Sequence, residues 1–336
     1  MGKFIVQRFI GMAVVLFVVS FITFFLMHAV PGGPFEREKS LPPDVIERLE
    51  AKYNLDEPLY MQYIHYVSDI LVPTITNETK ESNRFLINID LPGDTYIRWM
   101  DFGPSFKAAA SRSVTDIFRE NLPVSVRLGI AAMGVAMSIG IPLGIIAALR
   151  RNTIYDYGSM GIAILGVSVP VIVLGPLLRY IVGVELKWLP VTWGAADNSI
   201  QQIIMPAFAL GFSSSALLAR LTRASLLQIM DDDYIRTARS KGLTERVVVM
   251  RHAMRNALIP VVTILGPMFA AILTGTFVAE IVFGIPGLGR YFITSIGNRD
   301  YPVIMGTILL YAVFLVLANA VVDITYALLD PRIRFE

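Results

Sequence analysis

A charged segment between two long apolar runs contains the residue types best suited to contacts outside a membrane. It opens on Asp231, Asp232 and Asp233 and continues through polar and basic residues to Gly242. Acidic side chains interact favourably with the positive end of a helix dipole, and glycine commonly ends a helix. The spacing therefore predicts a short helix of about two turns, roughly 12 Å long, that presents polar groups to a soluble partner.

We assign contact with that partner to one uninterrupted set of residues. The set consists of Asp233, Tyr234, Ile235, Arg236, Thr237, Ala238, Arg239, Ser240, Lys241 and Gly242. No catalytic constellation accompanies them. The chain has no cysteine, and its three histidines are widely separated and lack the HExxH spacing of a zinc site. It also has no GxxxxGK[ST] loop, so we predict no catalytic residue, no metal site and no cofactor in this chain.

The elements that position the charged segment are apolar. Of the 336 residues, 54% are hydrophobic and only 17% are charged, and the mean hydropathy is +0.60. Soluble domains contain about 25% charged residues, so the composition indicates an integral membrane protein that contacts lipid. The net charge of +2 is spread along the chain and gives no basis for binding nucleic acid.

Uncharged runs long enough to cross a membrane, which takes about 20 residues, recur along the chain. They cover residues 9–30, 128–149, 158–178, 200–219, 257–279 and 301–322. We therefore predict an all-α, polytopic membrane protein with six transmembrane helices. The first run lacks a small-x-small cleavage site before Pro31, which favours a retained anchor over a signal peptide.

The short loops predict an orientation. If the N-terminus is inside, the cytoplasmic loops hold most of the basic residues, and the opposite short loops hold only Lys187, Arg290 and Arg299. The positive-inside rule then places both termini in the cytoplasm.

This orientation divides the chain into four parts. Residues 1–30 form the N-terminus and first helix, and residues 31–123 form an extracytoplasmic cap. Residues 124–329 form a five-helix core with a cytoplasmic loop at 220–256, and residues 330–336 form a cytoplasmic tail. Within the cap, the pattern predicts helices over 41–53 and 60–70 and a loop over 72–84.

Small residues and prolines within the runs predict close packing and kinks. Gly140 and Gly144 have small-xxx-small spacing, which Gly134 and Ser138 repeat. Kinks are expected at the prolines within the runs, which are Pro142, Pro170, Pro176, Pro206 and Pro267.

Charged residues lie mainly at the ends of the runs. Arg127 and Arg179 either extend to the interface or, for Arg179 in particular, face the bundle. Glu280 closes the fifth run, and Asp323, near the end of the sixth, is expected to pair with loop arginines. The segment 283–289 is rich in glycine but lacks a βαβ context, so it is interpreted as a turn.

Hydroxyl groups within the runs are candidates for lining a polar passage. They are Ser168, Ser213, Ser214, Ser215, Thr274 and Thr276. Each can instead donate to its own helix, and for any single residue that alternative is at least as good. As a set they remain candidates because the fourth and fifth runs flank the charged loop directly.

At this point the residues resemble a known family. Arg236-Thr-Ala238, followed by Gly242, resembles the cytoplasmic EAA loop of binding-protein-dependent ABC importer permeases, although Arg236 replaces the usual Glu and Met254-Arg255 replaces the later Leu-Pro. Both departures are shared by the peptide branch. The whole chain is similar to the B-subunit branch of oligopeptide importer permeases. The matching stretches are Leu41-Pro-Pro-Asp44, Glu50-Ala-Lys-Tyr53, Asp101-Phe-Gly-Pro-Ser-Phe-Lys107, Asp233-Tyr-Ile-Arg-Thr-Ala-Arg239, Pro286-Gly-Leu-Gly289, Asn298-Arg-Asp-Tyr301 and Asp330-Pro-Arg332.

The resemblance implies a fold, a location and partners. It implies the type I permease fold of ABC importers in a bacterial or archaeal cell membrane. It also implies a heterodimer with a second, homologous permease, two cytoplasmic P-loop ATPases that bind ATP and Mg²⁺, and an extracytoplasmic protein that delivers oligopeptides. Residues 233–242 would then couple the permease to an ATPase.

Other functions remain as alternatives. Related importers of this branch carry dipeptides, nickel chelates, glutathione or oligosaccharides. An intramembrane enzyme would need a Ser/His pair or two aspartates at one depth, which the sequence does not offer. A purely structural anchor would leave the charged segment unexplained.

Overall fold

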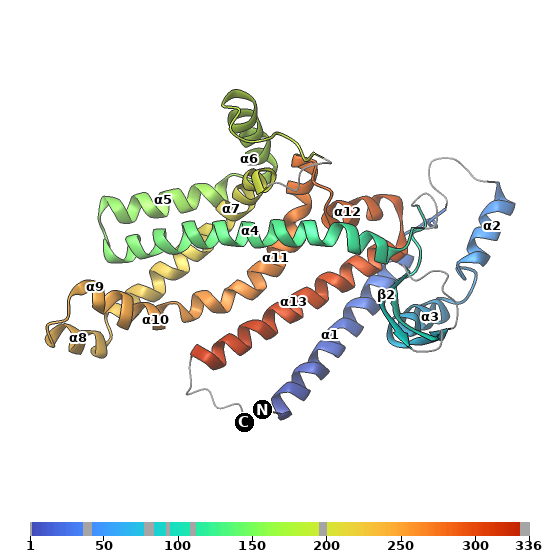
Figure 1. Cartoon of the computed structure of the whole chain (residues 1–336), viewed down its shortest axis with the longest axis horizontal. Helices are drawn as coiled ribbons and strands as arrows, with labels where there is room; N and C mark the ends of the chain where they lie inside the picture. The colour runs from blue at the N-terminus through green and yellow to red at the C-terminus, as the bar shows by residue number, and fades with distance from the viewer. Residues whose placement is uncertain are drawn as a thin grey trace. The chain divides into compact units, whose positions relative to one another are not determined.

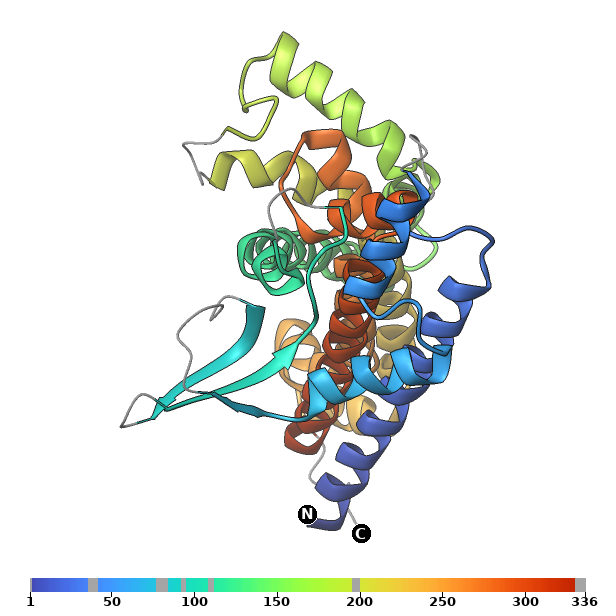
Figure 2. The same cartoon turned by 90° about the vertical axis from the view of Figure 1, so that its right-hand side faces the viewer.

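The computed structural model describes residues 2–35, 42–76, 84–91, 95–107, 112–194 and 200–329, and within these ranges the side chains of residues 2–5, 7, 9 and 322–329 are not described. The chain is mainly helical (Figures 1 and 2). In order, its elements are α1 (Gly2–Ala29), α2 (Pro43–Lys52), α3 (Leu59–Leu71), β1 (Thr74–Thr76), β2 (Phe85–Leu91), β3 (Thr95–Asp101), α4 (Val114–Leu149), α5 (Ile154–Ser168), α6 (Val171–Leu178), the π-helical turn η2 (Arg179–Glu185), α7 (Ile200–Met230), α8 (Asp233–Ser240), α9 (Glu245–Val247), the π-helical turn η3 (Val248–Ala253), α10 (Met254–Ala257), α11 (Ile259–Phe283), α12 (Leu288–Asn298) and α13 (Tyr301–Leu329).

The chain forms two compact units. The bundle unit comprises Met1–Arg8, Val124–Gly289 and Phe314–Glu336, and the sheet unit comprises Phe9–Pro123 and Arg290–Val313. Five helices in the described ranges are long and apolar enough to cross a membrane. They are Ile10–Ala29 within α1, then α4, α7 and α11 in full, and Tyr301–Val321 within α13.

The third predicted run, residues 158–178, is not a straight helix. It is shared between α5 and the α6–η2 pair, and the two parts meet at an angle of 99°. Pro170 explains the break, because helical backbone geometry is disfavoured for the residue before a proline and Val169 is accordingly extended. Pro142, Pro206 and Pro267, by contrast, lie inside helices that continue through them.

Glycine-mediated packing holds α4 against α7 in the bundle unit. A Cβ added to Gly140 would lie 2.5 Å from the Ser215 carbonyl oxygen, and one added to Gly144 would lie 2.6 Å from the Ala219 carbonyl oxygen. The close packing predicted for this glycine pair is therefore confirmed. An added Cβ at Gly134 would meet none of the described residues within 4 Å, so among them the earlier repeat of the motif mediates no close helix contact.

Two further glycines allow close packing, one between α7 and α4 and the other between α5 and α7. Gly211 of α7 lies against the backbone of α4 at Ala132, and Gly166 of α5 lies against the backbone of α7 at Phe212. Added methyl groups at both positions would overlap carbonyl oxygens. Helices that approach this closely gain van der Waals contacts, which is the main source of helix association where lipid surrounds them.

Three polar side chains, those of Glu280, Ser125 and Arg179, fix the end of α11. The Glu280 carboxylate is fully buried and accepts a hydrogen bond of 2.6 Å from the Ser125 hydroxyl, which itself accepts one of 2.8 Å from the Leu288 backbone N–H. A side chain at Gly287 would overlap this carboxylate. The Arg179 guanidinium donates to the Val282 carbonyl at 2.5 Å, so this arginine faces the bundle rather than extending away from it.

The end of α11 also has a local sequence cause. Gly284 ends the helix with a φ of 68°, a left-handed conformation that glycine adopts without steric cost. The predicted turn over 283–289 is present. It covers residues 284–287, and α12, a helix that the sequence pattern did not predict, begins at Leu288.

The sheet unit contains strands in addition to the two helices and the loop that were predicted for the cap. The two predicted helices are present as α2 and α3. Part of the predicted loop over 72–84 is instead strand β1, and residues 77–83 lie outside the described residues. β1, β3 and β2 form an antiparallel sheet in that order, with Thr76 opposite Tyr96 and Ile87 opposite Trp99. The Trp99 indole donates to the Leu71 carbonyl at 3.0 Å and so joins the sheet to α3.

The predicted ends of two other helices also differ from the structure. α4 begins at Val114, well before residue 128, because Asp116 and Ser113 form reciprocal hydrogen bonds at its start. α7 continues to Met230, so residues 220–230 are helical rather than loop. The side chain of Asp323 lies outside the described residues, so its predicted pairing with arginine stays a prediction.

Candidate functional site

The charged segment folds as the short helix α8. Asp232 precedes the helix with extended backbone, Asp233 lies in the first turn and Arg239 in the last, where each charge complements the helix dipole. After Ser240, Gly242 adopts a φ of 77° and lets the chain reverse into α9. The predicted two-turn helix and its glycine end are therefore present.

A small apolar core seats α8 on the bundle unit. Ile235 and Ala238 lie one turn apart on one face and are buried, at 0% and 6% exposed. They pack with Leu226 of α7, Ala148 of α4 and Val248 of η3. Because residues of α4, α7 and η3 all pack in this core, α8 has a fixed position relative to these helices.

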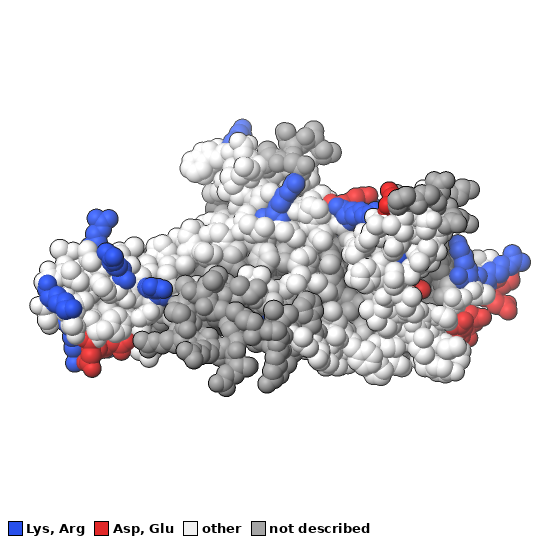
Figure 3. All heavy atoms as spheres, turned by 60° about the horizontal axis from the view of Figure 1, so that its bottom comes forward, with Lys and Arg blue, Asp and Glu red and all other residues white. Residues whose placement is uncertain are grey.

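The rest of α8 is exposed. Its other side chains carry hydroxyl and charged groups, and Arg and Lys side chains gather on the end of the bundle unit formed by α8 and α9 (Figure 3). Apolar groups stand among them: Tyr234 and Leu243 are each 39% exposed and Met250 is 63% exposed. Acidic side chains are exposed there too, at Asp233 and Glu245, and a surface that mixes charged and apolar groups is suited to a protein partner.

An ion pair closes the turn after α8. Arg239 donates from Nε and Nη2 to the two carboxylate oxygens of Glu245, at 3.2 and 2.7 Å. This hydrogen bonding holds the pKa of the Glu245 carboxyl below its usual range. Asn256 also donates to the Tyr234 hydroxyl at 2.9 Å, which joins α8 to α10. The sequence offered no signal for either contact, because both partners are common surface residues.

The predicted path residues differ in how accessible they are. Ser168 and Thr274 are exposed, and Ser213 and Ser214 are half-buried. Ser215 and Thr276 are fully buried. Five of these hydroxyls donate to carbonyls three or four residues earlier in their own helix, at Ile164, Leu210, Phe212, Ala270 and Leu273. Their role in a passage stays a prediction, and the exposed and half-buried members are the ones with a surface to offer.

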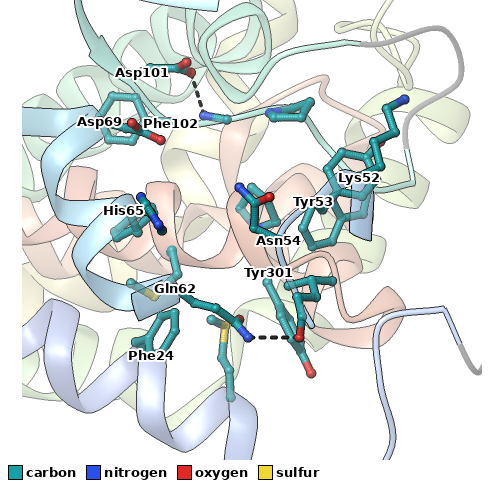
Figure 4. Close-up of a pocket in the computed structure, with 18 of the residues that line it drawn as sticks. Phe24, Lys52, Tyr53, Asn54, Gln62, His65, Asp69, Asp101, Phe102 and Tyr301 are labelled. Atoms are coloured by element: carbon teal, nitrogen blue, oxygen red, sulfur yellow. Dashed lines mark hydrogen bonds between the residues drawn. The ribbon is translucent and has the colours of Figure 1, made fainter. Parts of the chain in front are cut away.

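The sheet unit contains a second feature, a hollow of about 310 Å³. Figure 4 shows side chains from α1, α3, the chain after α2, the end of β3 and the start of α13 around it. Much of its polar lining is internally paired. Gln62 donates to the carbonyls of Leu55 and Glu57 at 3.0 and 2.8 Å, and Arg84 pairs with Asp101 at 2.5 Å.

Asp69 lines this hollow, and its shifted pKa predicts that the thermal stability of the protein depends on pH. Burial raises the pKa of the Asp69 carboxyl, and the nearby Asp101 carboxylate raises it further. A raised folded-state pKa gives stability that is present below the unfolded-state pKa of about 4 and is lost as the pH rises through the folded-state value. Asp69→Asn, which mimics the protonated form, is therefore expected to raise the thermal unfolding temperature at pH 7 and to change it little near pH 4.

Asp90→Asn provides the matched control for this measurement, because Asp90 is an exposed carboxylate on β2. The temperature should be measured by thermal unfolding of the purified complex in detergent. An Asp69→Asn variant that is less stable than the unaltered protein at pH 7 would show that the carboxylate contributes favourably and would contradict this interpretation.

The apolar helices define a polytopic membrane protein, and the comparisons with known proteins agree with that class. Residues 140–335 match the family described as "Binding-protein-dependent transport system inner membrane component", and residues 1–129 match "Binding-prot-dependent transport system membrane comp, N-term". The chain belongs to this family. It is a permease subunit of an ABC importer and a multi-pass protein of the inner membrane.

Curated relatives align with the whole chain. It is 42% identical over 337 residues to the dipeptide transport system permease protein DppB of Bacillus subtilis, covering 100% of this chain and 99% of that one. It is 38% identical over 335 residues to the oligopeptide transport system permease protein OppB of Escherichia coli K12, covering 100% of both. A glutathione transport system permease protein, GsiC of Escherichia coli O1:K1, is 39% identical and covers 100% of both.

A solved structure has a similar fold. The inward-facing MetNI methionine ABC transporter matches with a TM-score of 0.51 and 19% identity, over 64% of this chain and 96% of that chain. The likeness supports the type I permease fold of the helical core and nothing narrower.

Proposed function

We propose that this chain is the membrane subunit through which an ATP-driven importer translocates oligopeptides, and that α8 docks it onto an ATPase. The observation that carries the docking role is the division of α8 into two faces. Ile235 and Ala238 are buried in the chain's own core, while the hydroxyl and charged side chains are exposed. Because α8 is packed against α4 and α7, a displacement of α8 by the ATPase would move these helices as well. A flexible loop would move without displacing them.

The proposed assembly has four kinds of partner. They are a second homologous permease, two cytoplasmic ATPases with their ATP and Mg²⁺, an extracytoplasmic peptide-binding protein and the surrounding lipid. The loops rich in arginine, including the α8 loop, face the cytoplasm together with both termini. Residues 31–123 then lie on the extracytoplasmic side, where a binding protein would dock.

The substrate class rests on the relatives. Both DppB and OppB are named for peptide transport, at 42% and 38% identity. Dipeptides are the second candidate, because the relative with the higher of these two identities is named for dipeptide transport. A peptide brings backbone amides that cannot be left unpaired in hydrocarbon, so the proposed passage needs hydroxyls such as Ser168, Ser213, Ser214 and Thr274.

Single introduced cysteines test both the docking of α8 onto the ATPase and the membrane orientation. The chain has no native cysteine, so only the introduced thiol of the permease can react. Thr237→Cys, on the exposed face of α8, is expected to crosslink to an ATPase subunit through a short bifunctional thiol reagent. Thr74→Cys, exposed in the sheet unit, is expected to react with an impermeant thiol reagent added to intact cells. Labelling of the Thr237→Cys variant from outside, or crosslinking of the Thr74→Cys variant to the ATPase, would show that the predicted membrane orientation is wrong.

Peptide uptake tests the substrate class. Cells lacking this permease and supplied with the gene again should recover uptake of labelled peptides of several residues. Recovery restricted to peptides of two residues would favour the dipeptide alternative. Recovery of glutathione uptake without peptide uptake would contradict both.

A further inference from the structure

A buried ion pair in the bundle unit joins α5 to α7 close to α8. Arg223 of α7 donates from Nε to Asp156 Oδ1 at 2.8 Å and from Nη2 to Asp156 Oδ2 at 2.7 Å. The Asp156 side chain is only 3% exposed, and that of Arg223 is 28% exposed. Parallel two-point pairing of this kind is the strongest and most directional contact that arginine makes with a carboxylate.

Asp156 also fixes the turn between α4 and α5. Its Oδ2 accepts a hydrogen bond of 2.9 Å from the backbone N–H of Asn152. Asn152 has a φ of 61°, a left-handed conformation in the middle of that turn. The one carboxylate therefore ties both the arginine of α7 and the backbone of the α4–α5 turn.

The same part of α7 supports α8. Leu226, one turn beyond Arg223, is fully buried and packs in the core that seats Ile235 and Ala238. Thr222, beside Arg223, is also fully buried and lies against Gly144 of α4. This stretch of α7 is thus held by α5 through the ion pair, by α4 through glycine packing and by α8 through an apolar core.

These contacts lead us to propose that Asp156 and Arg223 are positioning residues that make the α4–α5 turn follow the displacement of α8. The proposal rests on the docking role of α8. A buried carboxylate that loses its guanidinium partner is strongly disfavoured, so the two helices stay paired whichever way α8 moves. An apolar contact between α5 and α7 could shift or repack, whereas the two hydrogen bonds between Arg223 and Asp156 fix one relative position of the two helices.

The experiment compares three forms of the assembled complex with its second permease and ATPases. Asp156→Asn/Arg223→Gln keeps the approximate shape but removes both charges, and Arg223→Lys keeps the charge but loses the two-point geometry. Arg220→Gln is the matched control, because Arg220 is exposed one turn earlier on the same helix and outside α8. We expect the double variant to hydrolyse roughly ten times more ATP for each peptide transported, Arg223→Lys to show a smaller rise, and Arg220→Gln to show none.

A distance measurement tests the mechanical link directly. Spin labels at Ile154→Cys on α5 and Gln228→Cys on α7, both exposed, report the separation of the two helices. With the ion pair intact, we expect one narrow distance distribution that is the same with and without ATP turnover. In the double variant we expect the distribution to broaden or split during turnover.

Three outcomes would overturn the proposal. One is an ATP-to-peptide ratio in the double variant equal to that of Arg220→Gln. Another is an unchanged distance distribution in the double variant. A third is loss of ATPase copurification in the double variant, because the pair would then build the docking surface instead of linking it to α5. Failure of the docking role itself would appear separately, as loss of the Thr237→Cys crosslink in the otherwise unaltered chain.

Discussion

Gly211→Val is expected to prevent the permease from accumulating in the membrane. A Cβ at this position would overlap the carbonyl oxygen of Ala132 in α4 and lie 2.7 Å from the Val135 Cβ. The first of these atoms is backbone, so no rotamer change can relieve the clash and the helices must move apart. Overpacking of an interior typically costs about 1–3 kcal/mol, occasionally more, which is a large fraction of typical protein stability.

Membrane-fraction immunoblotting and thermal unfolding in detergent measure this effect. Gly134→Val is the matched control, because Gly134 lies on α4 and an added Cβ there meets nothing within 4 Å. A second substitution, Val135→Ala, is not expected to rescue Gly211→Val, since the Ala132 carbonyl would remain. Normal accumulation of Gly211→Val would show that α4 and α7 do not approach each other this closely.

Gly242→Val is expected to lower peptide uptake roughly tenfold while leaving membrane insertion unaffected. Gly242 has a φ of 77°, and an added Cβ would meet nothing within 4 Å in this chain. The cost is therefore backbone strain of about 1–2 kcal/mol for an ordinary residue, which changes a population ratio by a factor of about 5–30. The strain acts on the turn between Arg239 and Glu245, where the reversal after α8 depends on the ion pair.

Gly242→Asn separates strain from crowding by a partner. Asparagine tolerates the left-handed conformation better than other residues with a Cβ, so we expect it to retain most of the uptake. If valine and asparagine fail equally, the ATPase needs the empty space at this position rather than the conformation. If the valine variant transports peptide normally with its ATPases bound, α8 is not the docking helix.

The short helices and the membrane-spanning runs could be predicted from consecutive residues alone. The acidic start and Gly242 predicted α8, because dipole complementarity and left-handed backbone are properties of a few consecutive residues. Helices α2 and α3 were also predicted from the local sequence pattern, which gave helices over 41–53 and 60–70. The apolar runs predicted the membrane class, since the length of an uncharged run depends on no other part of the chain.

The break at Pro170 and the sheet of the second unit needed more than local pattern. Pro142, Pro206 and Pro267 sit in continuous helices, so proline alone does not decide where a helix breaks. Neighbouring helices decide it as well, because they can hold the chain on both sides of a proline and satisfy the freed backbone groups. Strand β1 was missed because it is only three residues long, too short for a period-two pattern, and it forms by pairing with β3.

Sequence alone determined the family resemblance, the membrane class and the position of the short polar helix α8, all of which reside in contiguous residues. Tertiary structure alone decided which polar groups meet. Asp156 and Arg223 are far apart in sequence, as are Glu280 and Ser125, and nothing in either neighbourhood marks them as partners. Their meeting depends on how closely and in which register the helices pack, which glycine contacts set for α4, α5 and α7. A buried charge is tolerated only where the folded chain supplies its partner.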